Sequence, residues 1–190
     1  MERSLDFAPV AILVAGAGAG RAELCHSWQA VLALGGQPVL VSSSGGEVEL
    51  VRGPVLAGSM HVDVEVHDAD ATDFAGLVLP GGDCAEEASA RPSTSDGRAE
   101  AFVRAFFAAG LPVAAIGGAA RILAAADAVR GRQLTSAPSL RAELARAGAS
   151  WADSPVVVCE RRRSVLVTAQ GRSDLPVFCR AFTQRFFCRP

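Results

Sequence analysis

The chain has 190 residues, of which 50% are hydrophobic and 20% are charged, and this suits one domain with a sizeable core over residues 1–190. The formal net charge is −2, which argues against a nucleic-acid-binding protein, because such a protein would carry a basic face. All 18 basic residues are arginines, so a catalytic or Schiff-base lysine is excluded.

The longest apolar stretches are of strand length, and glycines interrupt them, so the sequence predicts no membrane-spanning helix. The first six residues lack the basic start and the apolar segment of a signal peptide. We therefore expect a cytoplasmic protein with neither membrane nor nucleic acid as a partner.

The five cysteines form no recognisable framework, because their number is odd and no two have CxxC spacing. They are Cys25, Cys84, Cys159, Cys179 and Cys188. We expect reduced and mostly buried thiols. No group of histidines, cysteines and acids has the spacing of a metal site, so we predict neither a metal nor a cofactor.

The first half of the chain alternates short apolar runs with segments of helical spacing. The expected order is a buried strand at 10–15, a glycine-rich loop, a helix at 21–34, strands at 38–42, 47–51 and 62–66, and a buried strand at 76–80. Residues 85–97 are small and polar, which is typical of a flexible loop that borders a site.

The second half continues the alternation. We expect helices at 98–109, 119–127 and 138–147, strands at 113–116, 156–158 and 165–167 with a turn at 160–163, and a last helix from a cap near Ser173 towards Phe187. Strands that alternate with helices predict a mostly parallel sheet with both faces covered.

The glycine-rich loop at residues 16–20 only partly matches a dinucleotide-binding loop. Its sixth position is Arg21, and residues 42–44 are serines where an acid is expected at the end of the second strand. We therefore favour a simple tight turn over nicotinamide or flavin binding.

Residues 112–119 predict a buried strand that runs directly into a helix. In many α/β enzymes such an elbow carries the nucleophile. Here the elbow holds Gly117 and Gly118, which have no side chain for chemistry. Any function must therefore be compatible with an elbow that lacks a reactive group.

Glu23 and His26 lie three residues apart at the start of the first predicted helix, so they share a face. The preceding loop follows the carboxyl end of a strand, where ligands bind in open α/β sheets. A carboxylate and an imidazole there are candidates for moving a proton. The alternative is a surface pair or an interface contact.

Cys84 is the one cysteine whose position by itself indicates a site, because it follows Gly81 and Gly82 at the end of a predicted strand. Three neighbouring acids would raise its pKa and reduce its reactivity. A buried or inert thiol is therefore the favoured interpretation.

The order of the motifs resembles the ThiJ/PfpI superfamily, the group of the PfpI-type intracellular proteases and the Parkinson-linked deglycase. The matching segments are 68–70 (DAD), 73–74 (DF), 77–82 (LVLPGG), 112–116 (PVAAI), 131–132 (GR), 135–136 (TS), 147–153 (AGASWAD) and 174–176 (DLP). The resemblance spans about residues 10–182. It implies a flavodoxin-like three-layer α/β/α sandwich of the class I glutamine amidotransferase-like type, usually a homodimer.

The resemblance also implies a site built from three loops. In the family a cysteine followed by a histidine occupies the elbow, and Gly117 and Gly118 match these positions. Glu23 matches a glutamate that hydrogen-bonds the family cysteine. Gly81 and Gly82 match a loop that supplies backbone donors, and Glu86 matches an acid that reaches a neighbouring subunit in PfpI-type members.

Three functions remain open at this point. The first is a small-molecule-binding or regulatory protein without thiol catalysis, in other words a pseudoenzyme whose elbow N–H groups and Arg121 attract a carboxylate or carbonyl ligand. The second is a non-covalent acid/base hydrolase, lyase or isomerase that uses Glu23 on a small carbonyl-containing metabolite. The third is thiol chemistry through Cys84 or Cys25.

Overall fold

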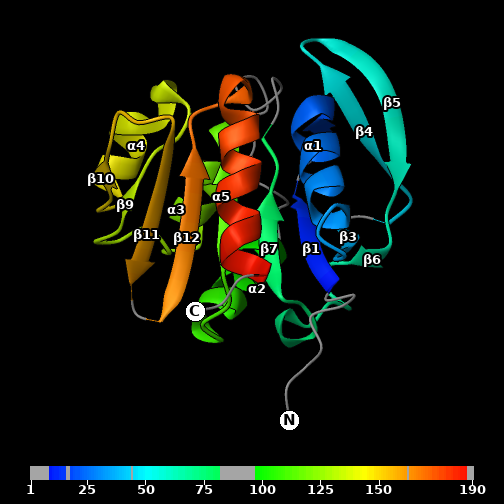
Figure 1. The fold of residues 1–190 in the computed structure, drawn as a ribbon, viewed down its shortest axis with the longest axis horizontal. Coiled ribbons are helices and arrows are strands. Elements are labelled where there is room, and N and C mark those ends of the chain that lie inside the picture. Colours follow the sequence, from blue (N-terminus) through cyan, green and yellow to red (C-terminus); the bar gives the residue numbers. More distant parts are fainter. Residues whose placement is uncertain (1–8, 16–17, 44, 82–96, 162, 188–190) are drawn as a thin grey trace.

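A mostly parallel sheet forms the centre of the computed structural model, which describes residues 9–15, 18–43, 45–81, 97–161 and 163–187. Its seven strands are ordered β11-β12-β8-β7-β1-β3-β6 (Figure 1). Their bounds are β1 Pro9–Val14, β3 Gln37–Ser42, β6 Val64–Glu65, β7 Gly76–Leu79, β8 Val113–Ile116, β11 Val156–Arg161 and β12 Ser164–Ala169. Neighbours run parallel except β11, which is antiparallel to β12.

Helices cover both faces of this sheet. Helices α1 (Arg21–Leu32) and α5 (Leu175–Phe187) pack on one face, and α2 (Arg98–Ala108) and α3 (Ala120–Ala125) pack on the other, with α4 (Arg141–Arg146) beside α3 (Figure 1). The predicted three-layer, flavodoxin-like α/β fold is confirmed.

The unbroken apolar run of β1 explains why this strand lies near the middle of the sheet. Val10, Ile12 and Val14 belong to the core under α1 and α5, whereas Ala11 and Leu13 belong to the core under α2 and α3. Successive side chains of a strand point to opposite faces, so a strand with helices on both sides must be apolar throughout.

Two small sheets flank the central one. Strands β2 (Gly18–Gly20), β4 (Glu47–Arg52) and β5 (Val55–His61) form one, and β9 (Gln133–Leu134) pairs with β10 (Ser150–Trp151) in the other. The β4–β5 hairpin projects beside α1 (Figure 1). Short 3-10 turns complete the elements, at Ala71–Asp73, Gly117–Ala119, Pro138–Leu140 and Arg172–Asp174.

The prediction of one strand over 62–66 is wrong for most of that segment. The chain turns at Gly53, whose φ is 58°, and residues 55–61 fold back on β4, so the strand precedes the predicted one. Only Val64–Glu65 join the central sheet. Asp63 follows the hairpin and is bound to β3, because its carboxylate accepts a hydrogen bond from the Leu40 N–H at 2.7 Å.

The prediction of a simple tight turn at residues 16–20 is also wrong for the part that the structure describes, Gly18–Gly20, which forms strand β2. Gly18–Gly20 pair in parallel with β4, and a Cβ on Gly18 would lie 2.8 Å from the carbonyl oxygen of Glu49. Glycine therefore permits the close approach of two strands here, a role that the glycine-rich pattern does not distinguish from a turn.

Several predicted ends shift by a few residues. The first helix ends at Leu32, before Gly35 at φ 76°, and α3 and α4 are shorter than expected because 3-10 turns precede them. Strand β11 extends to Arg161, so the predicted turn at 160–163 is tighter. The last helix begins at Leu175 after a turn in which the Asp174 carboxylate accepts from the Gly171 N–H at 3.1 Å.

Within the described ranges, no helix is both long and apolar enough to cross a membrane.

Phe178 and its neighbour Val177 test the contribution of α5 to the core. Phe178 is fully buried against the sheet, whereas Val177 is 49% exposed. We expect Phe178→Ala to lower the free energy of unfolding by about 3–5 kcal/mol, because it removes a buried ring and leaves a cavity. Urea denaturation measures the loss, and Val177→Ala is the control. Equal losses in the two variants would contradict this packing.

Candidate functional site

The predicted elbow is present at the carboxyl end of β8. Gly117 directly follows this strand, is buried, and has a φ of 62°. This left-handed conformation favours glycine, because a Cβ crowds the backbone there. The chain then continues through the 3-10 turn Gly117–Ala119 into α3. The elbow is therefore a sharp, left-handed turn that glycine adopts without strain and that carries no side chain.

Space for a side chain exists at this position. Among the described residues, the nearest atom to a Cβ built on Gly117 is the Gln170 carbonyl oxygen, at 3.6 Å, an ordinary van der Waals contact. The backbone angle at position 117 therefore favours glycine, whereas crowding by neighbouring atoms does not.

Gly81 brings a second segment against the elbow. Its carbonyl oxygen accepts a hydrogen bond from the Gly20 N–H at 2.9 Å, and a Cβ on Gly81 would lie 2.5 Å from the carbonyl oxygen of Ile116. Only glycine permits this approach without a shift of the backbone. The starts of α1 and α3 and the end of β7 therefore converge at the carboxyl edge of the sheet, where open α/β sheets bind ligands.

The segment after β9 supports the elbow from the other side. The Ala137 N–H donates to the Gly117 carbonyl oxygen at 3.3 Å, and the Thr135 N–H donates to the Thr168 hydroxyl at 2.9 Å. Trp151 Nε1 donates to the Ser136 hydroxyl at 3.0 Å. Thr135 and Ser136 belong to the family-like motifs, but nothing in their spacing indicates that the next residue, Ala137, bonds the elbow.

The structure separates Glu23 from His26 by exposure. Glu23 lies in the first turn of α1 and is only 6% exposed, whereas His26 is exposed. The His26 Nδ1 atom lies 2.8 Å from the Ala22 carbonyl oxygen, so Nδ1 carries the proton of that hydrogen bond. The proton-transfer pair of Glu23 and His26 stays a prediction.

The structure describes some of the other residues that we predicted to bind a ligand, but not all of them. The Arg121 Nε atom donates to both carboxylate oxygens of Glu143 on α4, at 3.1 and 3.2 Å, so this guanidinium is held by an ion pair. Gly118 lies in the 3-10 turn that leads into α3. Gly82, Cys84 and Glu86 lie outside the described residues. The ligand-binding roles of all five residues stay predictions.

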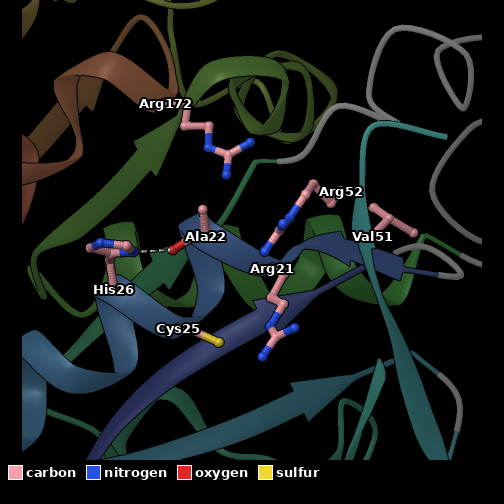
Figure 2. Close-up of a pocket in the computed structure, with 7 residues that line it drawn as sticks. All are labelled: Arg21, Ala22, Cys25, His26, Val51, Arg52 and Arg172. Carbon is pink, nitrogen blue, oxygen red and sulfur yellow. Dashed lines mark hydrogen bonds between the residues drawn. The ribbon is translucent and has the colours of Figure 1, made fainter. Parts of the chain in front are cut away.

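A cavity of about 240 Å³ lies beside the first turns of α1. Its lining consists of Arg21, Ala22, Cys25, His26, Val51, Arg52 and Arg172. Figure 2 shows the side chains of Arg52 and Arg172 reaching from two sides towards the first turn of α1, where Ala22 lies. Sequence reasoning missed this cavity, because its residues come from α1, β4 and the turn before α5.

Cys25, Cys159 and Cys179 are free thiols, each half-buried, and Cys188 lies outside the described ranges. Burial raises the pKa of the Cys179 thiol from 9.0 to about 11, which makes this residue a poor nucleophile. In the part of the chain that the structure describes, no three histidines, cysteines and acids gather as metal ligands.

A family model and individual proteins of known sequence both match this chain. A model of the DJ-1/PfpI family matches residues 8–185. The chain is 34% identical to general stress protein 18 of Bacillus subtilis over 68% of this chain and 71% of that protein. It is 31% identical to protein/nucleic acid deglycase 2 of Escherichia coli over 77% of this chain and 79% of that protein.

Solved structures show the same fold. Drosophila melanogaster DJ-1beta matches with a TM-score of 0.78 at 20% identity, over 96% of this chain and 92% of that chain. A two-domain protein of Anabaena variabilis, with DJ-1/ThiJ/PfpI-like and ferritin-like domains, matches with a TM-score of 0.79 at 25% identity. That match covers 94% of this chain and 48% of the larger protein.

The elbow angle predicts a graded response to substitution. We expect Gly117→Ala to lower the free energy of unfolding by about 1–2 kcal/mol, because alanine pays the left-handed strain. Gly117→Asn should lose less, because asparagine tolerates this region better. Gly171 is the control, since its φ is −177° and no described atom lies within 4 Å of its Cβ position. Gly171→Ala should change stability little, and a loss equal to that of Gly117→Ala would argue against strain at the elbow.

The burial of Cys179 predicts slow alkylation. With a pKa of about 11 in place of 9.0, its thiolate fraction at pH 8 is about a hundredfold lower. Peptide mass spectrometry after iodoacetamide treatment should show slow labelling of Cys179 in the folded chain and fast labelling in urea. Labelling at the same rate in both states would contradict this burial.

Proposed function

We propose that the chain, which belongs to the DJ-1/PfpI family, binds a small molecule at the carboxyl edge of its sheet without a thiol step at the elbow. The observation that carries this proposal is Gly117, a buried residue with a φ of 62° directly after β8. By the resemblance of the motifs, Gly117 matches the position of the reactive cysteine in the family.

Glycine at this position offers no reactive group, while the backbone contacts around it assemble the carboxyl edge of the sheet. Protein/nucleic acid deglycase 2 of Escherichia coli is a relative by sequence, and nucleophilic catalysis by a thiol at the elbow needs a sulfur that glycine does not supply. The hydrogen bonds from Gly20 to Gly81 and from Ala137 to Gly117 still assemble the same edge. A retained site without its nucleophile favours reversible binding over covalent catalysis.

The expected ligand carries a carbonyl or a carboxylate. A Cβ on Gly117 would meet only the Gln170 carbonyl oxygen among the described residues, so we infer that a small ligand group fits at this position. The Thr135 hydroxyl is buried and has no hydrogen-bond partner among the described residues, so a polar group remains to be satisfied near the elbow segment. These features support a polar small molecule as the occupant.

One observation favours a second candidate function, non-covalent acid/base catalysis. Glu23 is 6% exposed at the start of α1, and a buried carboxyl group is a suitable general acid or base. This enzyme would act on a small carbonyl-containing metabolite. Thiol chemistry through Cys84 is disfavoured by the neighbouring acids in the sequence.

A binding screen followed by elbow variants tests the proposal. We expect a carboxylate or carbonyl compound to raise the melting temperature of the wild-type chain, because a ligand that binds only the folded state stabilises it. The shift should shrink in Gly117→Asn, which fills the elbow, and persist in Gly171→Ala, measured by differential scanning fluorimetry.

Activity assays separate the candidates. With a methylglyoxal-treated protein as substrate, the wild-type chain should release no adduct, as measured by mass spectrometry. Turnover that is abolished by alkylation of the thiols would falsify the proposal. Turnover that survives alkylation and is lost in Glu23→Gln would instead establish the acid/base enzyme.

A further inference from the structure

We propose that the ligand of the elbow site is a small 2-amino acid, whose ammonium group pairs with the carboxylate of Glu23. This inference rests on the proposed function, which places a carbonyl or carboxylate compound at the elbow, and it names the class of that compound. It depends on Glu23, which is only 6% exposed and has no hydrogen-bond or ion-pair partner among the described residues.

Among the described residues, no side chain neutralises the charge of Glu23. Arg21 donates to a backbone carbonyl oxygen of β5, and Arg121 pairs with Glu143 on α4. Ser27 lies one turn further along the same face of α1, yet its buried hydroxyl also has no partner. A buried carboxylate without a partner opposes folding, so we expect a partner from outside the chain.

The carboxylate of Glu23 nevertheless borders open space. In the described part of the chain, the side-chain atoms that are both fully enclosed and unpartnered belong to Ser27, Ser42, Glu100 and Thr135, and no atom of Glu23 is one of them. Since the Glu23 oxygens make no hydrogen bond, the small exposed fraction of this residue includes its carboxylate. The group is therefore buried over most of its surface and open at one point, where a ligand can reach it.

The backbone brings the first turn of α1 to the elbow. Gly20 precedes the helix, and its N–H donates to the Gly81 carbonyl oxygen at 2.9 Å, while Gly81 lies against Ile116 at the end of β8. Leu24 belongs to the same core cluster as Ile116, and Glu23 is buried beside Leu24 in the helix. The Glu23 carboxylate and the elbow therefore open on one hollow.

A second acceptor lies at the elbow itself. A Cβ on Gly117 would lie 3.6 Å from the Gln170 carbonyl oxygen, so a ligand atom at this position meets an acceptor. An ammonium group carries three N–H donors, whereas a hydroxyl group carries one donor. A carboxylate and a carbonyl oxygen around one position therefore favour an ammonium group over a hydroxyl group.

The negative charge of Glu23 also limits which carboxylate compounds fit the proposed function. A simple carboxylate is repelled by Glu23, and this repulsion is stronger in a buried site than in water, because the effective dielectric constant is lower there. An ammonium group on the ligand replaces the repulsion by a charge-assisted hydrogen bond. In a 2-amino acid the ammonium and the carboxylate are attached to the same carbon chain one atom apart, which suits two adjacent subsites.

Isothermal titration of the full-length chain at neutral pH with matched small compounds tests the inference. L-alanine offers an ammonium and a carboxylate, L-lactate a hydroxyl and a carboxylate, propionate a carboxylate alone and ethylamine an ammonium alone. We expect L-alanine to bind at least about tenfold more tightly than L-lactate or propionate, because only L-alanine pairs a positive charge with Glu23. In Glu23→Gln this preference should disappear.

Ser27→Ala is the matched control, because Ser27 lies on the same buried face of α1 and its hydroxyl has no partner. This variant should bind L-alanine as the wild type does. Urea denaturation should show that Glu23→Gln is at least as stable as the wild type, since the substitution removes an unpaired buried charge. A clear loss of stability in Glu23→Gln would show that the carboxylate is a structural group and would contradict the inference.

The compounds also separate this inference from the proposed function. Propionate or L-lactate that binds as tightly as L-alanine overturns the inference and leaves the proposed function standing. Ethylamine that binds only when Glu23 is present, with no carboxylate compound bound, keeps the ammonium subsite and overturns the carboxylate subsite of the proposed function. Absence of binding of all the compounds at millimolar concentration overturns the inference.

Discussion

The contact between Gly81 and the end of β8 determines the geometry on which the site depends. The Gly81 backbone approaches Ile116 so closely that a Cβ would lie 2.5 Å from its carbonyl oxygen, and the same residue accepts a hydrogen bond from Gly20. One residue without a side chain thus joins the start of α1, the end of β7 and the elbow. These contacts involve only backbone atoms, so none of them needs a side chain at position 117.

The backbone of the elbow does not depend on a reactive side chain. The elbow angle is set by β8, by the hydrogen bond from Ala137 and by the turn into α3, and none of these requires a thiol. Glycine at φ 62° avoids the strain that a residue with a Cβ would carry. Glycine at position 117 therefore favours the stability of the folded chain.

The sequence was sufficient to predict the elements of the fold whose side chains are buried. The apolar runs of β1, β7 and β8 predicted the strands of a sheet covered on both faces, and the elbow followed from Gly117 after such a strand. It was insufficient where distant segments meet. The role of Gly18 beside Glu49 and the arginine cavity depend on how the β4–β5 hairpin lies against α1, and single-chain periodicity carries no such information. Burial likewise separates Glu23 from His26, although their spacing is helical.

The short strand β2 links the hairpin mechanically to the rest of the molecule. Gly18–Gly20 pair with β4 on one side and lead directly into α1 on the other, while Arg21 contacts Ala57 on β5. A tilt of the hairpin would therefore move the start of α1 with it. Substitutions in the exposed arm that change this tilt would shift the first turn of α1, although they lie outside the central sheet.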